Sequence, residues 1–149
     1  LQDPGLYPDV GRDVAGFLAA RIAAAVEAGV DPRSIVVDPG VDFTKTPAQT
    51  VEVLRALDDV DPDGLPLLLA LSRKDFVGAL TLTRPMERLA GTLAAVAAVG
   101  SRPGVILRVH DVAEVRRFLT VLEALTTDVE VDPELRLADE LRWAAGRPG

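Results

Sequence analysis

The fold is indicated most clearly by the stretch Leu65-Pro66-Leu67-Leu68-Leu69-Ala70-Leu71, which runs directly into Ser72-Arg73-Lys74-Asp75. The first part is continuously apolar rather than alternating. Continuous hydrophobicity is typical of a strand that is covered on both faces, as in parallel sheets flanked by helices. The stretch therefore predicts a central strand whose carboxyl end opens into a charged loop.

The same organisation is repeated on both sides of this strand. Apolar residues at helical spacing alternate with short β-branched runs, and Gly or Pro residues separate the two. Phe17, Met86, Val112 and Leu125 belong to the apolar stripes of the helices. The pattern predicts helices over residues 10–29, 47–57, 86–97 and 112–125, and strands over residues 34–37, 65–71 and 105–107.

Strictly alternating helices and strands predict an α/β fold with neighbouring parallel strands and helices outside. Three strands cannot close a barrel, and an open sheet of three strands would leave an edge and apolar faces bare. An eight-stranded barrel usually needs about 250 residues. We therefore expect the C-terminal part of a (β/α)8 TIM barrel, and a chain that is a fragment of a longer protein.

The chain divides by composition into two parts. Residues 1–127 carry the strand and helix pattern, and residues 128–149 form a more acidic tail. The tail has one apolar stripe, made of Leu135, Leu137, Leu141 and Trp143. This stripe predicts a helix that docks on the barrel or is covered by a partner.

Composition excludes several classes of protein. Acidic residues outnumber basic ones by 23 to 16, and a net charge of −7 would repel a polyanion, so a nucleic-acid partner is not expected. The absence of Cys and the single His exclude a thiolate or His-clustered zinc site within the chain. No apolar run approaches the roughly 20 residues that span a bilayer. We expect no membrane partner and a cytoplasmic location.

Polar side chains follow all three predicted strands, where ligands bind in parallel α/β folds. They are Asp38, Lys74, and the pair Arg108 and His110. Arg108 and His110 are two residues apart in an extended segment, so both point to the same side and can converge on one anion. We expect these four side chains to surround a common hollow. Each also has a structural interpretation: Asp38 as a turn cap, Lys74 together with Arg73 as a solvated pair of loop cations, and His110 as a satisfied structural residue.

The chemistry of these groups indicates a pocket for a polar heterocycle that carries a phosphate leaving group. The Asp38 carboxylate can accept from an amidine-like pair of N–H groups, and Lys74 can donate to a ring carbonyl or nitrogen. Arg108 and His110 suit a phosphate, and Phe43 offers an apolar face. No nucleophile is present among these residues.

At these positions the chain resembles the dihydropteroate synthase family of pterin-binding barrels. The segment from Asp38 to Lys45 is similar to the family pattern Asp-Pro-Gly-x-Gly-Phe-x-Lys. The segment from Ala70 to Asp75 is similar to Gly-x-Ser-Arg-Lys-Ser, and Arg108-Val109-His110-Asp111-Val112 matches the family pattern throughout. Three spaced motifs in the right order make the resemblance specific.

The resemblance implies a transferase of folate biosynthesis. Such an enzyme condenses 6-hydroxymethyl-7,8-dihydropterin diphosphate with p-aminobenzoate and releases dihydropteroate and diphosphate. It implies that Asp38 and Lys74 bind the pterin, and that Arg108 and His110 hold the diphosphate. Lys74, Arg108 and His110 would form the catalytic set, with Mg²⁺ bound to the diphosphate rather than to ligands of this chain. It also implies a homodimer and a need for the N-terminal half of the barrel.

Two departures from the family pattern leave alternatives open. Asp75 stands where the family has a serine that helps to hold the carboxylate of p-aminobenzoate, and Asp42 replaces a glycine. Two like charges about 4 Å apart repel by about 1 to 4 kcal/mol at effective dielectric constants between about 80 and 20. One alternative is therefore a divergent paralogue that binds pterin or diphosphate without condensation. Another is a methyl-folate-binding methyltransferase domain, which has no need of Arg108 and His110.

Overall fold

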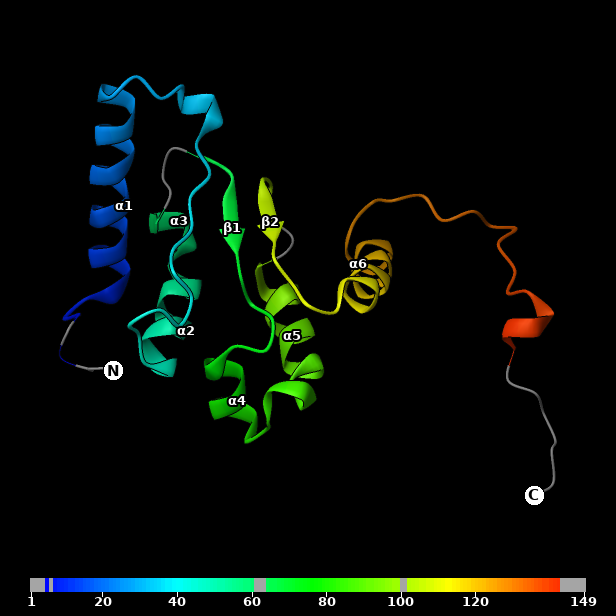
Figure 1. Cartoon of the computed structure of the whole chain (residues 1–149). Helices are drawn as coiled ribbons and strands as arrows, with labels where there is room; N and C mark the ends of the chain where they lie inside the picture. Colours follow the sequence, from blue (N-terminus) through cyan, green and yellow to red (C-terminus); the bar gives the residue numbers. More distant parts are fainter. Residues whose placement is uncertain (1–4, 6, 61–63, 100–101, 143–149) are drawn as a thin grey trace.

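The computed structural model describes residue 5 and residues 7–60, 64–99 and 102–142 (Figure 1). Helices and strands alternate along these residues, and short 3-10 helices are labelled η. In chain order the elements are α1 (Val10–Glu27), η1 (Pro32–Ser34), α2 (Pro47–Arg55), α3 (Leu57–Val60), β1 (Leu67–Leu69), α4 (Asp75–Thr81), η2 (Pro85–Glu87), α5 (Leu89–Val99), β2 (Val105–Leu107), α6 (Val112–Thr126) and η3 (Asp139–Leu141).

The strands are parallel and adjacent. β1 pairs with β2 in a register that sets Leu67 opposite Val105 and Leu69 opposite Leu107. On the other side of β1, Val37 forms a single parallel bridge to Leu67. The spatial order is thus Val37, β1, β2. The prediction of an α/β fold with neighbouring parallel strands is confirmed.

The predicted strand over residues 34–37 is wrong except at Val37. Asp31 and Pro32 start a 3-10 turn instead, in which the Asp31 carboxylate accepts a hydrogen bond of 2.9 Å from the backbone N–H of Arg33. Proline at the first helical position suits such a turn because its φ is already near the helical value. The turn takes Ser34 out of the predicted strand, and of the remaining residues only Val37 pairs with the sheet.

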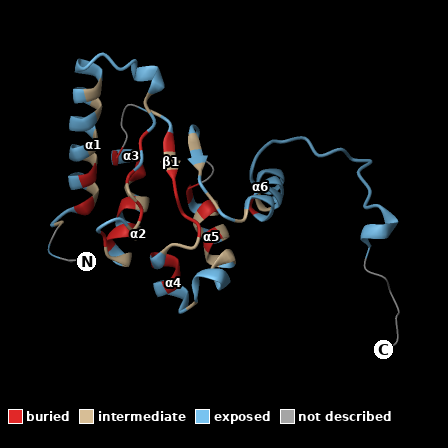
Figure 2. Ribbon diagram, viewed as in Figure 1, coloured by how far each residue is buried: buried red, intermediate tan, exposed pale blue. Residues whose placement is uncertain are grey.

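The core surrounds β1 (Figure 2). Leu67 and Leu69 are both buried, which agrees with the continuous apolar run of the sequence. Helices from both sides of the chain contribute to the same cluster. Its other buried members are Val37, Val41, Leu57, Leu71, Phe76, Val77, Val96, Val99 and Val115.

The helices occur near the predicted places, but with different bounds. The helix expected over residues 47–57 is divided into α2 and α3, and α2 begins with a capping box between Thr46 and Gln49. The helix expected from residue 86 begins at Leu89, and α4 was not anticipated. Phe17, Met86, Val112 and Leu125 are all exposed, because the apolar stripes are wider than the surface that this chain covers.

The tail does not dock on the rest of the chain. Between residues 127 and 142 the structure has one helical turn, η3, and the segment extends away from the sheet (Figure 1). Leu135, Leu137 and Leu141 are exposed, so the expected docked helix is absent from residues 128–142. Val129 and Val131 alternate with carboxylates at a period of two, which gives no helical stripe. Trp143 lies outside the described residues.

None of the helices within the described residues is long and apolar enough to cross a membrane.

Candidate functional site

The segment at Val37 and the strands β1 and β2 are parallel and adjacent, so their carboxyl ends lie at the same end of the sheet. The chain continues from these ends into the segments that begin at Asp38, Ala70 and Arg108. The loops predicted to carry the site therefore come together as expected. Among the described residues, the four expected side chains are divided between two hollows.

The first, which we call the arginine hollow, has a volume of about 480 Å³. Its cationic side chains come from the loops after β1 and β2. Arg108 and His110 line the hollow from the β2 side, and both are exposed. The complete lining is Ala70, Ser72, Arg73, Lys74, Pro85, Arg108, Val109 and His110.

Ser72 holds the imidazole of His110. The Ser72 hydroxyl oxygen lies 3.1 Å from Nδ1 of His110 and accepts a hydrogen bond of 3.3 Å from the backbone N–H of the same residue. Ser72 is buried, whereas His110 is exposed. The contact orients the ring through Nδ1. No role for Ser72 was predicted, because nothing in the sequence pairs two residues that lie 38 positions apart.

Arg73 joins the two loops of the arginine hollow. Its guanidinium forms an ion pair with Asp111, at 2.7 Å from Nη2 to Oδ1 and 3.3 Å from Nε to Oδ2. Both side chains are about three-quarters buried. A two-point contact of this kind constrains position as well as charge. Arg73 is therefore part of the scaffold and not a solvated loop cation.

Arg108 differs from Arg73 in having no partner. Among the described residues, no carboxylate or carbonyl oxygen accepts a hydrogen bond from its guanidinium, which faces the arginine hollow. An exposed guanidinium with all its donors available is suited to bind a phosphate oxygen pair.

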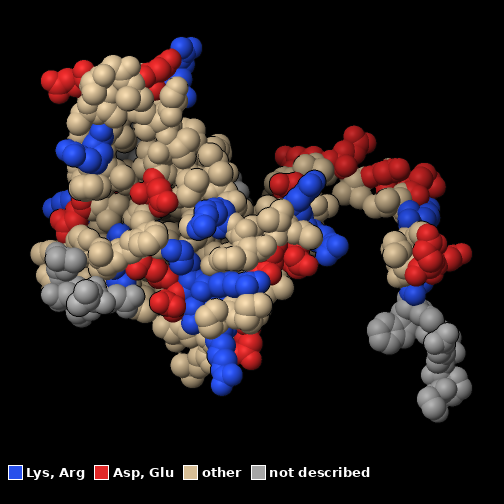
Figure 3. Space-filling model, viewed as in Figure 1, with Lys and Arg blue, Asp and Glu red and all other residues tan. Residues whose placement is uncertain are grey.

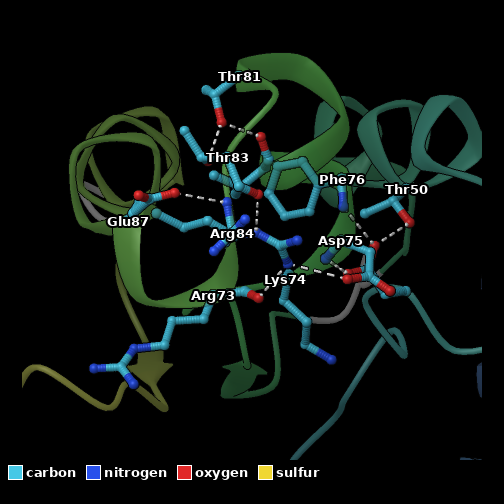
Figure 4. Close-up of polar contacts among 12 residues, drawn as sticks. Thr50, Arg73, Lys74, Asp75, Phe76, Thr81, Thr83, Arg84 and Glu87 are labelled. Carbon is cyan, nitrogen blue, oxygen red and sulfur yellow. Dashed lines mark hydrogen bonds and ion pairs between the residues drawn. The ribbon is translucent and has the colours of Figure 1, made fainter.

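Lys74 lies between the two hollows. Its ammonium donates a 2.8 Å hydrogen bond to the carbonyl of Val41 and lies 4.5 Å from the centre of the Phe43 ring. Figure 4 shows the Lys74 side chain extending away from the polar contacts that surround Asp75 and Phe76. The interpretation of Lys74 as a freely solvated cation is wrong, because two groups of the preceding loop hold it.

The second hollow, which we call the aspartate hollow, has a volume of about 290 Å³ and lies between α1 and the loop of residues 38–45. Asp38 and Phe43 line it, whereas Lys74, Arg108 and His110 line the arginine hollow, so in the described part of the chain the four expected side chains do not share one hollow. Asp38 also caps its turn, since Oδ1 accepts a 2.8 Å hydrogen bond from the N–H of Gly40. The interpretation of Asp38 as a turn cap is thus confirmed for Oδ1. The side chain also lines the aspartate hollow.

Lys45 stabilises this loop from inside. Its side chain is only 5% exposed, and Nζ donates to the carbonyls of Gly40 at 3.0 Å and Phe43 at 3.3 Å. Burial lowers the pKa of Lys45, and the nearby Tyr7, Asp38 and Asp42 partly offset this effect. At Gly40, where φ is +69°, a side chain would lie 3.3 Å from Nζ. The loop therefore closes around a buried cation.

The two acidic substitutions have partners inside the chain. Asp75 pairs with Arg88 at 3.0 Å, and the Arg88 side chain is only 11% exposed. The Asp42 carboxylate accepts hydrogen bonds from the backbone of α4 and from Thr50. Neither carboxylate is among the groups that line the two hollows. The carboxylates of Asp42 and Asp75 should therefore repel an anionic substrate less than unpaired carboxylates would.

The described residues contain no cluster of three or more His, Cys, Asp or Glu side chains that could hold a metal ion. The arginine hollow is cationic, and its donor groups suit an anion better than a metal. Figure 3 shows acidic side chains along the tail, which extends away from the rest of the molecule.

Comparison with known proteins places these features in a family context. The model of the pterin binding enzyme family matches residues 2–110. Dihydropteroate synthase of Bacillus subtilis is 39% identical over 120 residues, which are 80% of this chain and 42% of that protein. The Escherichia coli dihydropteroate synthase is 34% identical over 124 residues, 83% of this chain and 44% of its own length. The chain thus spans less than half the length of these curated relatives.

A solved structure agrees in fold as well as in sequence. The Xanthomonas albilineans dihydropteroate synthase in complex with 7,8-dihydropteroate is 40% identical, with a TM-score of 0.78 over 87% of this chain and 50% of that one. The match includes the parallel segments and the loops that follow them, since the family model extends from residue 2 to His110. On the strength of both comparisons, this chain belongs to the pterin-binding enzyme family.

Proposed function

We propose that this chain is the C-terminal part of a barrel enzyme that joins 6-hydroxymethyl-7,8-dihydropterin diphosphate to p-aminobenzoate, giving dihydropteroate and diphosphate. The observation that carries the proposal is the arginine hollow, where Lys74, Arg108 and His110 converge at the carboxyl ends of adjacent parallel strands. Relatives that are 39% and 34% identical are dihydropteroate synthases, which supports this choice of reaction.

The arrangement suits a reaction in which negative charge develops on a leaving group. The carbon–oxygen bond to the diphosphate breaks, and its electron pair leaves with the diphosphate. The amine nitrogen of p-aminobenzoate bonds to the same carbon and loses a proton. Arg108 and His110 stabilise the charge that accumulates on the diphosphate, because Ser72 orients the imidazole and the donors of Arg108 are available to the anion. No protein nucleophile is required.

Asp38, Lys74 and Phe43 bind the pterin ring. The free oxygen edge of Asp38 faces the aspartate hollow and suits the amino-pyrimidine N–H groups of the pterin. Phe43 offers its ring, and the Lys74 ammonium beside it serves a ring carbonyl or nitrogen. Lys74 thus contacts both parts of the pterin diphosphate.

The proposal includes an N-terminal half of the barrel that this chain does not contain. Val37 and β2 are the outer parallel segments, and among the described residues nothing pairs with their outer edges. Val36 and Ile106, which lie in or beside these segments, are also about half exposed, so further strands would pair the open edges and cover apolar side chains. Five more strands would close the sheet into the eight-stranded barrel and complete both hollows.

The predictions of Mg²⁺, a homodimer and a cytoplasmic location remain predictions. Mg²⁺ is proposed only as an ion that arrives with the diphosphate, because the residues of the arginine hollow do not fit a metal site. The homodimer remains a prediction from the resemblance, and the cytoplasmic location remains a prediction from the apolar pattern of the sequence. The role of Lys74, Arg108 and His110 in the chemistry does not depend on any of the three.

The structure weakens the case for a paralogue without condensation activity. That alternative depended on the charges of Asp42 and Asp75, and both have partners within the chain. A methyl-folate-binding methyltransferase binds no diphosphate, so that alternative does not account for the unpaired guanidinium of Arg108. Neither alternative is supported by a specific contact.

The test is a turnover assay on the complete protein that contains this chain, with the pterin diphosphate and p-aminobenzoate as substrates. Wild-type protein should form dihydropteroate and release diphosphate. The variant Arg108→Ala should lose most of this activity, whereas Arg117→Ala is the matched control, because Arg117 is exposed on α6 and outside both hollows. No turnover by wild-type protein, or equal losses in the two variants, would overturn the proposal.

A further inference from the structure

Asp42 caps a helix to which it does not belong. Its Oδ2 accepts a hydrogen bond of 2.5 Å from the N–H of Asp75, and its Oδ1 accepts one of 3.4 Å from the N–H of Phe76. These are the first two residues of α4. Lys74 stands at the N-cap position of this helix but makes no side-chain cap itself. The carboxylate that satisfies these donors comes from a loop more than 30 residues earlier.

The contact has a counterpart in the opposite direction. While the side chain of Asp42 binds the backbone beside Lys74, the side chain of Lys74 binds the backbone beside Asp42, with 2.8 Å from Nζ to the carbonyl of Val41. We call this reciprocal pair of contacts the Asp42–Lys74 clamp. Val41 is buried, so one end of the clamp is anchored in the core.

Thr50 fixes the clamp from a third element. Its hydroxyl donates a 3.1 Å hydrogen bond to Oδ1 of Asp42, and the Thr50 side chain is fully buried on α2. Figure 4 shows Thr50, Asp75 and Phe76 grouped around these polar contacts. The carboxylate of Asp42 is therefore held in one orientation, with its charge directed at the start of α4.

The backbone around the clamp is held in an unfavourable conformation. Asp42, Thr44 and Arg73 all have positive φ, at 65°, 55° and 61°. Apart from Leu82, they are the only non-glycine residues with positive φ in the described part of the chain. Such conformations persist only where surrounding contacts over-determine them. The two loops are thus locked together rather than resting in relaxed turns.

We propose that Asp42 is a positioning residue for Lys74. By tying the loop of residues 38–45 to the start of α4, its carboxylate sets the Lys74 ammonium beside the Phe43 ring and at the border of the arginine hollow. The clamp thereby couples the two hollows, so that a heterocycle beside Phe43 and an anion beside Arg108 meet the same cation. The coupling of ligands rests on the proposed function, whereas the placement of Lys74 does not.

The variant Asp42→Gly removes the clamp without adding strain, because glycine readily adopts a φ near +65°. Lys45 and Lys74 are the two lysines of this chain, and in the lysine-labelled complete protein the signals that disappear in Lys74→Arg are those of Lys74. In the wild type, the ring of Phe43 should shift the Lys74 ε-proton signals upfield. In Asp42→Gly that shift should diminish, and the affinity for inorganic diphosphate should fall about three- to tenfold.

Leu82→Gly is the matched control for the glycine substitution. Leu82 also has a positive φ, lies at the opposite end of α4 and is 93% exposed. It should leave the Lys74 signals and the diphosphate affinity unchanged. Asp42→Asn, which keeps one acceptor oxygen and most of the side-chain shape, should fall between the wild type and Asp42→Gly and serves if the glycine variant unfolds.

A double variant separates positioning from mere stabilisation of α4. If Asp42 acts through Lys74, Asp42→Gly should cause no further loss of diphosphate affinity when Lys74 is already replaced in Lys74→Met. Equal losses in both backgrounds, or unchanged Lys74 signals in Asp42→Gly, would overturn the proposal. If the wild type binds no diphosphate, the proposed function fails, but the lysine signals still decide whether the clamp exists.

Discussion

The aspartate hollow and the arginine hollow are built in opposite ways. The loop beside the aspartate hollow satisfies its own groups, since Lys45 binds two of its carbonyls and Asp38 caps its turn. In the arginine hollow, Arg73, Lys74 and His110 each have a partner, but the guanidinium of Arg108 has none among the described residues. The polar groups of the loop beside the aspartate hollow are therefore satisfied without a ligand, whereas the donors of Arg108 remain available to an anion.

The comparison makes a general point about preorganisation. Groups that shape a pocket can be satisfied internally, because their task is to hold a fixed form. Groups that bind charge must keep their donors free, and this costs little when they are exposed to water. Substitutions should thus affect stability on one side of Lys74 and affinity on the other.

The largest effect is expected from Lys45→Ala. Loss of the buried ammonium leaves the carbonyls of Gly40 and Phe43 without their donor, so the free energy of unfolding should fall by roughly 3 kcal/mol. Denaturant unfolding of both proteins measures this. A loss under about 0.5 kcal/mol, typical of surface substitutions, would mean that the loop does not need its internal cation.

The same residue gives a dependence of stability on pH. Burial lowers the pKa of Lys45 from its ordinary value of 10.5, so between the two values the unfolded chain binds more protons than the folded one. Stability contributed by this residue should therefore rise with pH in that window. Comparison of Lys45→Ala with the wild type across the window should show a flatter profile in the variant.

Arg108→Ala should do the reverse of Lys45→Ala. Without its charged hydrogen bonds, the affinity for inorganic diphosphate should fall by about ten- to a hundredfold, equivalent to about 1.5 to 3 kcal/mol. The free energy of unfolding should hardly change, because Arg108 is exposed and unpaired. Calorimetric titration and denaturant unfolding together test both halves, and a large loss of stability would contradict the contrast between the hollows.

Ser72→Ala should have a smaller effect on the arginine hollow. It removes the hydroxyl that orients His110, so the imidazole becomes free to turn and diphosphate affinity should fall about fivefold, near 1 kcal/mol. In the double variant with His110→Ala, the serine substitution should add almost nothing. Independent losses would show that Ser72 acts on the ligand by another route.

The smallest effect is expected from Asp75→Ser. The variant removes a negative charge that Arg88 already offsets, and Asp75 is 71% exposed, so affinity for p-aminobenzoate should rise by less than about fivefold. Calorimetric titration with pterin and diphosphate present is the measurement. A much larger increase would show that the ion pair with Arg88 does not reduce the repulsion.

Local patterns predicted most elements, and they failed where long-range contacts decide. The continuous apolar run correctly indicated a strand at residues 67–69, because a strand that is covered on both faces needs an apolar residue at every position. Residues 34–37 carry a similar β-branched pattern but form a turn and a single bridge, since Pro32 and Asp31 stabilise a competing local structure. Apolar stripes likewise overestimated burial at Met86 and Leu125.

The amino-acid sequence by itself determined the α/β class, the parallel arrangement and the identity of the charged groups at the strand ends. These depend on periodicity and spacing, which are local properties. Only the tertiary structure decided that Asp38 and Arg108 face separate hollows, that Ser72 orients His110, and that Asp42 caps α4. Such contacts join residues more than 30 positions apart, and their geometry exists only once the strands have set the loops side by side.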